Sequence, residues 1–176
     1  KAFPGGGPAL LPAFAASEID IGFMGEIPAV IGYANGLPIS IFMVLETYPS
    51  NVRLIVNPKE IKTLQDLKGK KIAVTFGSTS HYHALLALAS ARLSQSDVTL
   101  VNMGPANMPG AYEAGQIDAA VSWEPSAGEL EKLGGRRIAT TESLGTIVSY
   151  VCVARQAYLQ EHPDAIQKFL HIWETM

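Results

Sequence analysis

Residues 70–82 have the sequence KKIAVTFGSTSHY, which joins a short apolar run to a loop of small polar residues. The run Lys71–Thr75 predicts a buried strand, because it is apolar and is followed by the turn residue Gly77. Leucines and alanines then recur at helical spacing over His81–Leu93, and the helix is expected to begin at about Ser80. A strand that passes through a short loop into a helix is the repeating unit of α/β proteins.

The loop between this strand and this helix has side chains that suit an oxyanion. Gly77 lets the backbone approach a ligand, and Ser78, Thr79 and Ser80 place hydroxyls beside the free N–H groups of a helix start. The loop has no Lys or Arg, so a monoanionic sulfonate, nitrate or carboxylate fits it better than a doubly charged phosphate. Plain N-capping of the helix is the alternative interpretation and stays open. The Gly-Lys-Ser/Thr ending of a P-loop is missing.

Further apolar runs on both sides of this unit extend the α/β pattern. Short strands are expected at 39–45, 52–56, 98–101 and 149–154. Their alternation with helical patterns predicts parallel sheets with helices on both faces. The charged stretch 59–71 is interpreted as a linker and a short surface helix between two lobes. We therefore expect a first lobe over residues 1–59, a second lobe over 60–146, and a return to the first lobe over 147–176.

An internal repeat supports this two-lobed organisation. The stretch 7–28 resembles the stretch 104–125: each starts with Gly-Pro-Ala and later contains Ile-Asp, with Glu six residues after the Asp. Each copy predicts a loop, a short helix, a strand and a loop that opens another helix. Ligands of open α/β sheets bind beyond the carboxyl ends of the strands, so the helix-opening loops of the two lobes are expected to converge on one cleft.

Composition excludes several classes of protein. The chain has 176 residues, of which 48% are hydrophobic and 16% charged, with a formal net charge of −3. This balance is too apolar for a disordered chain and gives nucleic-acid binding no electrostatic support. The single cysteine, Cys152, excludes a disulfide framework and a Cys-cluster zinc site, and it is expected to be a core thiol. The catalytic patterns G-x-S-x-G and H-E-x-x-H are absent, so no catalytic residue, cofactor or metal is expected.

The two ends suggest a piece of a longer protein. The chain begins at Lys1 without a signal-peptide pattern. Residues 163–176 predict an amphipathic helix, and neither Gly nor Pro follows to end it. We therefore expect an internal fragment, and a native C-terminal helix is the alternative.

Taken together, these motifs resemble the solute-binding proteins of ABC importers for taurine, alkanesulfonates and nitrate, a group that includes pyrimidine-precursor binding proteins. The resemblance lies in the loop 76–82, in IKTLQDLKGKKI at 61–72, in AGQIDAAVSWEP at 114–125, and in the stretches 16–28 and 153–164. It covers nearly the whole chain in the right order. The resemblance implies a type II periplasmic binding protein fold, in which two α/β lobes close like a hinge on the ligand.

The function implied by the resemblance is that of the substrate-binding component of an ABC importer. It would capture a small organic anion, a sulfonate such as an alkanesulfonate or a taurine-like compound, and would deliver it to permease and ATPase subunits. The protein would be monomeric, and either periplasmic or lipid-anchored outside the membrane. The alternatives are a binding protein for nitrate, bicarbonate or a thiamine-pyrimidine precursor, and a ligand-sensing domain or pyrimidine-processing enzyme of the same fold.

The residues expected to contact the ligand lie in the helix-opening loops and on the returning strand. Trp123 could stack on the ligand or belong to the core, and Glu124 could contact the ligand, pair across the hinge or cap a helix. Two positions depart from the taurine binders: Tyr150 replaces an acidic residue, and Glu26 replaces a small hydroxyl residue. The expected ligand-binding residues are Gly25, Glu26, Gly77, Ser78, Thr79, Ser80, His81, Tyr82, Pro105, Trp123, Glu124 and Tyr150.

Overall fold

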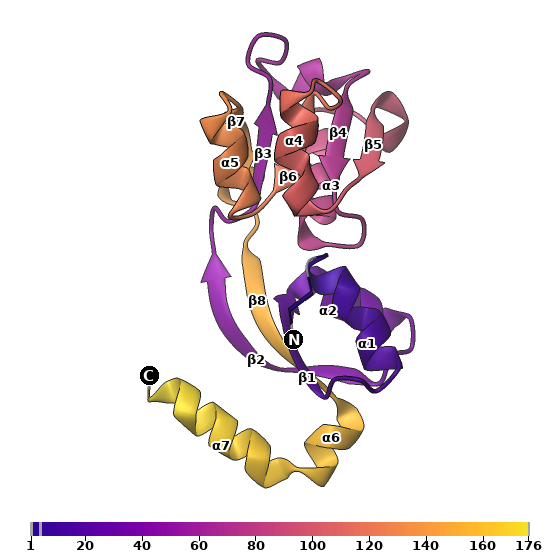
Figure 1. Ribbon diagram of the computed structural model, residues 1–176, viewed down its shortest axis with the longest axis vertical. Coiled ribbons are helices and arrows are strands. Elements are labelled where there is room, and N and C mark those ends of the chain that lie inside the picture. Colours follow the sequence, from indigo (N-terminus) through magenta and orange to yellow (C-terminus); the bar gives the residue numbers. More distant parts are fainter. Residues whose placement is uncertain (1, 4, 176) are drawn as a thin grey trace.

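The structure is a computed structural model that describes residues 2, 3 and 5–175, and it has two lobes, each built on its own sheet. Figure 1 shows the lobe with five strands stacked on the lobe with three, with β2 (Ile39–Tyr48) and β8 (Val148–Arg155) running between them. None of the helices within the described residues is long and apolar enough to cross a membrane.

The second lobe is a five-stranded mixed sheet. The strand order is β5-β4-β6-β3-β7, and the bounds are β3 Arg53–Val56, β4 Lys71–Val74, β5 Thr99–Asn102, β6 Ala119–Ser122 and β7 Arg136–Thr140. Strand β4 pairs in parallel with β5 and β6, whereas β3 pairs antiparallel with β6 and β7. The expectation of a parallel sheet is therefore correct only for the part of this lobe centred on β4.

Helices cover both faces of this sheet, as the strand–helix alternation predicts. Alternate strand residues point to opposite faces, so Ile72 packs with α3 (Thr79–Ser90) while Ala73 packs with α4 (Met108–Glu113) and α5 (Ser126–Lys132). Short 3-10 helices complete the lobe: η2 Leu64–Leu67, η3 Gln95–Asp97, η4 Pro105–Asn107 and η5 Glu142–Leu144. The N-terminal end of α3 is thereby fixed at the carboxyl end of β4, next to the first lobe.

The first lobe has the sheet order β1-β8-β2, with β1 at Ile21–Gly25. Strand β8 pairs antiparallel with both neighbours, so the parallel sheet expected here is wrong. The physical reason is that β1 and β2 both run toward the second lobe, and the strand that returns from that lobe inserts between them. The helical elements of this lobe are η1 Gly7–Leu10, α1 Leu11–Ala15, α2 Glu26–Ala34, α6 Gln156–Glu161 and α7 Pro163–Glu174.

The chain crosses between the lobes earlier than the sequence predicts. Strand β3 was expected in the first lobe, whose boundary was set after residue 59, yet it pairs with β6 and β7 in the second lobe. Leu54, Ile55 and Val56 are all buried there. The crossing therefore lies between the end of β2 at Tyr48 and the start of β3 at Arg53.

Three further predictions from the sequence concern the internal repeat, Cys152 and the C-terminal helix. The two repeat copies fold in the same order: 3-10 helix, short α-helix, strand and α-helix, in η1-α1-β1-α2 and in η4-α4-β6-α5. Cys152 is fully buried in β8, and this burial raises the pKa of its thiol to about 12. The helix expected at 163–176 is α7; its last predicted residue, Met176, lies outside the described residues.

Candidate functional site

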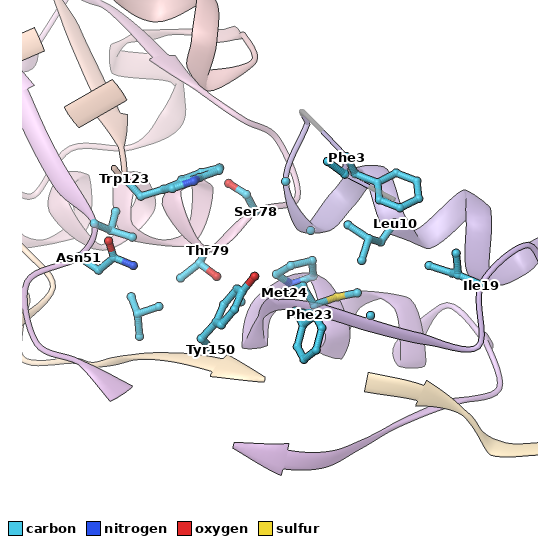
Figure 2. Close-up of a pocket in the computed structure, with 18 of the residues that line it drawn as sticks. Phe3, Leu10, Ile19, Phe23, Met24, Asn51, Ser78, Thr79, Trp123 and Tyr150 are labelled. Carbon is cyan, nitrogen blue, oxygen red and sulfur yellow. The ribbon is translucent and has the colours of Figure 1, made fainter. Parts of the chain in front are cut away.

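A cavity of about 430 Å³ lies between the two lobes, which is within the ~300–1,000 Å³ range of small-molecule sites. Figure 2 shows it with Trp123 and Thr79 on the second-lobe side and Phe23, Met24 and Tyr150 on the first-lobe side. The described residues that line it are Ala2, Phe3, Gly6, Gly7, Leu10, Ile19, Ile21, Gly22, Phe23, Met24, Gly25, Pro28, Asn51, Val52, Ser78, Thr79, Trp123, Val148 and Tyr150. None of these residues carries a charged side chain.

Ser78 lines the cavity, but its hydroxyl caps α3. Ser78 Oγ donates to the carbonyl oxygen of Thr75 at 2.6 Å and accepts from the N–H of His81 at 3.3 Å. It also lies 2.8 Å from Ser80 Oγ, and Ser80 must be the donor because the single hydroxyl proton of Ser78 is already used. N-capping, the alternative left open by the sequence, is thus what this hydroxyl does. Ser80 is fully buried and does not line the cavity.

Thr79, the first residue of α3, lines the cavity, and its hydroxyl is not used in a hydrogen bond within the described chain. Its Oγ1 atom is buried. The backbone N–H groups of Thr79 and Ser80 begin the helix, where such groups have no intrahelical acceptor. A buried hydroxyl without a partner costs free energy. An oxyanion accepting from Thr79 would remove that cost.

Gly25 is the point where the first lobe meets Thr79. A Cβ atom at Gly25 would lie 2.4 Å from Thr79 Oγ1, closer than any real contact. The backbone of Gly25, at φ −66° and ψ 157°, is accessible to every residue type. Glycine is therefore required here by the approach of the two lobes and not by the backbone conformation.

The remaining residues predicted around this loop do not line the cavity. Gly77, at φ +74°, donates its N–H to His81 Nδ1 at 3.3 Å, which leaves the neutral imidazole protonated on Nε2. The His81 ring stacks on Phe76 with 4.8 Å between the ring centroids, and burial lowers its pKa. Tyr82 is exposed and lies edge-on to His83. We find no geometric support in this structure for direct ligand contacts from Gly77, Ser80, His81 or Tyr82.

Glu26 completes the edge of the first-lobe sheet and does not line the cavity. The β1–β8 ladder ends with the pair Gly25 and Tyr150, and the next N–H along β8, that of Ser149, donates to Glu26 Oε2 at 2.9 Å. The Glu26 carboxylate thus supplies the hydrogen-bond acceptor that one more residue of β1 would supply. Burial raises the pKa of Glu26, and the backbone hydrogen bonds only partly oppose this effect.

Glu124 and Pro105 also have structural partners away from the cavity. Glu124 Oε1 lies 2.7 Å from Arg53 Nη1, and its other carboxylate oxygen accepts from the N–H of Gly128 at 3.1 Å. The sequence left three roles open for Glu124. In the structure Glu124 caps a helix, and its ion pair with Arg53 lies within its own lobe and not across the hinge. The carbonyl oxygen of Pro105 accepts from the buried Ser126 hydroxyl at 2.9 Å.

Five predicted residues therefore surround the cavity: Gly25, Ser78, Thr79, Trp123 and Tyr150. Sequence reasoning missed the apolar first-lobe wall, chiefly Leu10, Phe23 and Met24, and also Asn51 in the crossing segment. The internal repeat was a usable signal for that wall. It places the first-lobe copy opposite the second-lobe copy, so residues 7–25 were candidates for the same cleft.

His83 gives the site helix a predictable pH dependence. Its Nδ1–H donates to the Thr79 carbonyl oxygen at 2.7 Å, while Nε2 is buried with no hydrogen-bond partner in the described part of the chain. Burial is the main reason that the pKa of His83 is lowered from its usual 6.5. The unfolded chain therefore binds the proton first, and the free energy of unfolding decreases as the pH falls below 6.5 toward the lowered pKa.

We expect His83→Asn to flatten this dependence, because an amide keeps the donor to Thr79 without titrating. Urea unfolding of both proteins between pH 7.5 and 5, in steps of about half a pH unit, measures the pH dependence of the free energy of unfolding. One proton gives a slope of up to ~1.4 kcal/mol per pH unit. His81 and Glu26 titrate in both proteins, so their contributions cancel when the pH dependence of one protein is subtracted from that of the other. Parallel curves would show that His83 is not held neutral by the fold.

Comparison with known proteins gives consistent results. A model of the family described as NMT1/THI5 like matches residues 2–175. The taurine-binding periplasmic protein of Escherichia coli is 31% identical over 166 residues, which are 93% of this chain and 51% of that protein. A putative aliphatic sulfonates-binding protein of Escherichia coli is 35% identical over 137 residues, 77% of this chain and 43% of that protein.

A solved structure is similar over almost the entire chain. The alkanesulfonate-binding protein SsuA from Xanthomonas axonopodis pv. citri, bound to MOPS, is 30% identical with a TM-score of 0.86, and the match covers 98% of this chain and 60% of that one. The chain spans about half the length of the curated relatives described above.

Proposed function

Because the chain belongs to the NMT1/THI5-like family, we propose that it is part of the substrate-binding component of an ABC importer that captures a small organic sulfonate between its two lobes. The type II periplasmic binding protein fold expected from the sequence is confirmed by the similarity to SsuA. The relatives above are named as binding proteins, two of them for sulfonates and one for taurine, and this supports binding as the function.

The observation that carries the proposal is the buried hydroxyl of Thr79 at the start of α3, which has no hydrogen-bond partner among the described residues and lies beside a cavity whose described lining is uncharged. A helix N-terminus offers N–H groups and the positive end of the helix dipole, which favour an anion. The sulfonate oxygens would accept from Thr79 Oγ1 and from the first N–H groups of α3. A monoanion needs no full counter-charge there, in agreement with a lining that has no Lys or Arg among its described residues.

The proposed mechanism is reversible capture, without covalent chemistry. The sulfonate would bind at the second lobe while the lobes are apart. Gly25 of the first lobe, which lies against Thr79 in this structure, would then close over the anion and separate it from water. Trp123 and Tyr150, on opposite sides of the cavity, would contact the organic tail. We also propose that the protein is monomeric, that it is either periplasmic or lipid-anchored outside the membrane, and that its partners are the permease and ATPase subunits of the importer.

Thr79→Val tests the anion site. Valine has the shape of threonine without the hydroxyl, so the sulfonate would lose one donor, which corresponds to about 1–3 kcal/mol, or about 5-fold to 150-fold in Kd. Isothermal titration of the full-length protein with propane-1-sulfonate measures the change. The ligand-free variant is expected to be at least as stable as the parent, because the unpartnered hydroxyl is removed.

Thr99→Val is the matched control, since Thr99 is exposed on β5 and has the same side chain. Its Kd is expected to equal that of the parent. Equal affinities of Thr79→Val and the parent would place the anion away from the start of α3.

A further inference from the structure

We infer that the cavity selects sulfonates whose tail is uncharged, and discriminates against those that end in a primary ammonium, such as taurine; this inference rests on the proposed function. The comparisons do not decide between the two kinds of tail, since one relative is named a taurine-binding protein and two are named for aliphatic sulfonates or alkanesulfonates. The structural basis is the combination of an apolar wall opposite the anion site and two carboxylates engaged outside the cavity.

The wall that would face the tail is apolar on several sides. Its members include Leu10, Met24 and Val148, which are buried, and Tyr150, which is about 40% exposed. Phe23 also borders the cavity, but its ring packs against Phe169 of α7. Figure 2 shows Phe23, Met24 and Tyr150 on one side of the cavity and the Trp123 indole across from them. A methyl-terminated or aromatic tail would bury apolar surface on this wall, which is favourable.

Among the residues that the structure describes, none of those lining the cavity has a carboxylate that could neutralise an ammonium group. The described lining residues include no Asp or Glu, and the two nearby candidates from the sequence are already used. Glu26 accepts from the N–H of Ser149, and Glu124 pairs with Arg53 and caps α5. A cation that leaves water without a counter-charge pays a large desolvation cost.

The aromatic rings do not replace the missing carboxylate. Trp123 and Tyr150 present π-systems that attract a cation. A primary ammonium, however, also has three N–H donors that require acceptors, and ring faces satisfy them poorly. Because the uncompensated desolvation outweighs the attraction to the rings, the tail with a methyl group is favoured over the tail with an ammonium group.

A pair of ligands of equal size separates charge from shape. Taurine and propane-1-sulfonate have the same number of non-hydrogen atoms and differ in that an ammonium group replaces a methyl group. Isothermal titration of the full-length wild-type protein with each gives the ratio of their Kd values. We expect propane-1-sulfonate to bind at least about 30-fold more tightly, with isethionate, which ends in an uncharged hydroxyl, in between.

A gain of function at Tyr150 tests the cause of the preference. Tyr150→Glu adds a carboxylate to the cavity wall at a side chain exposed enough to tolerate it. This variant is expected to shift the affinity ratio at least tenfold toward taurine. Tyr150→Gln, of similar size but neutral, is the control and is expected to leave taurine disfavoured.

The outcomes distinguish failure of this inference from failure of the proposed function. Equal or tighter binding of taurine by the wild type would overturn the inference alone, and loss of that binding in Glu26→Gln would identify Glu26 as the ammonium partner. Tight binding of N,N,N-trimethyltaurine would also overturn it, since the rings would then act as a cation cage. If neither sulfonate binds while nitrate, bicarbonate or a thiamine pyrimidine does, the proposed function fails.

Discussion

Gly25→Ala is expected to weaken sulfonate binding about 100-fold, on the order of 3 kcal/mol, while the protein stays folded. The new Cβ would lie 2.4 Å from Thr79 Oγ1, so either the lobes move apart or the Thr79 side chain rotates. Both movements remove a contact that the bound sulfonate needs. The backbone at Gly25 accepts alanine without strain, at φ −66° and ψ 157°, so the effect is confined to the contact between lobes.

Gly104→Ala is a matched control for this variant. Gly104 has nearly the same backbone conformation, φ −67° and ψ 145°, and also precedes a helical segment. A Cβ atom there would meet no atom within 4 Å. Titration calorimetry and thermal unfolding of both variants are expected to show lost affinity for Gly25→Ala alone, with similar Tm values. An unchanged Kd in Gly25→Ala would mean that the lobes do not close at this contact.

Leu130→Ala is expected to have the largest effect on stability, a loss of about 2–5 kcal/mol in the free energy of unfolding. Leu130 is fully buried in α5, and it belongs to the core on the face of the second sheet that includes Ile55 and Met108. Truncation removes its transfer free energy and leaves a cavity. Total stabilities of about 5–15 kcal/mol make such a loss a large fraction of the whole.

Leu133→Ala, at the end of the same helix, provides the comparison. Leu133 is 42% exposed, so its truncation is expected to cost well under about 1 kcal/mol. Urea unfolding at fixed pH measures both variants, and the dependence on urea concentration should not change. Similar losses in the two variants would contradict the packing of α5 described above.

The sequence allowed the site helix and its strand to be predicted almost to the residue. Strand 71–75 and the helix start near Ser80 correspond to β4 at Lys71–Val74 and α3 from Thr79, because the short apolar run, Gly77 and the hydroxyl residues at the helix start are local signals. The lobe boundary was misplaced for a related reason. The charged stretch 59–71 is a clear local signal, but it lies inside the second lobe, and the actual crossing near Pro49 and Asn51 is short and uncharged.

Most of the residues that line the cavity could not be predicted, because tertiary partners determine the site. Glu124, in the loop after β6, forms a salt bridge with Arg53 of β3, and no local sequence pattern shows that pairing. The loop 77–82 was treated as one binding surface, yet a helix turns about 100° per residue, so only one side of its first turn faces the cavity. Thr79 lies on that side, whereas Ser80, His81 and Tyr82 do not line the cavity.

A thermal-shift titration of the full-length protein shows directly whether it binds organic sulfonates. The ligands are propane-1-sulfonate, benzenesulfonate, taurine, nitrate, bicarbonate and a thiamine pyrimidine. A ligand at about 100 times its Kd adds ~2.7 kcal/mol of stability, or several degrees in Tm. We expect such a shift with the two sulfonates that have uncharged tails and not with nitrate, bicarbonate or the pyrimidine. A shift with the pyrimidine alone, or with none of the sulfonates, would contradict this expectation.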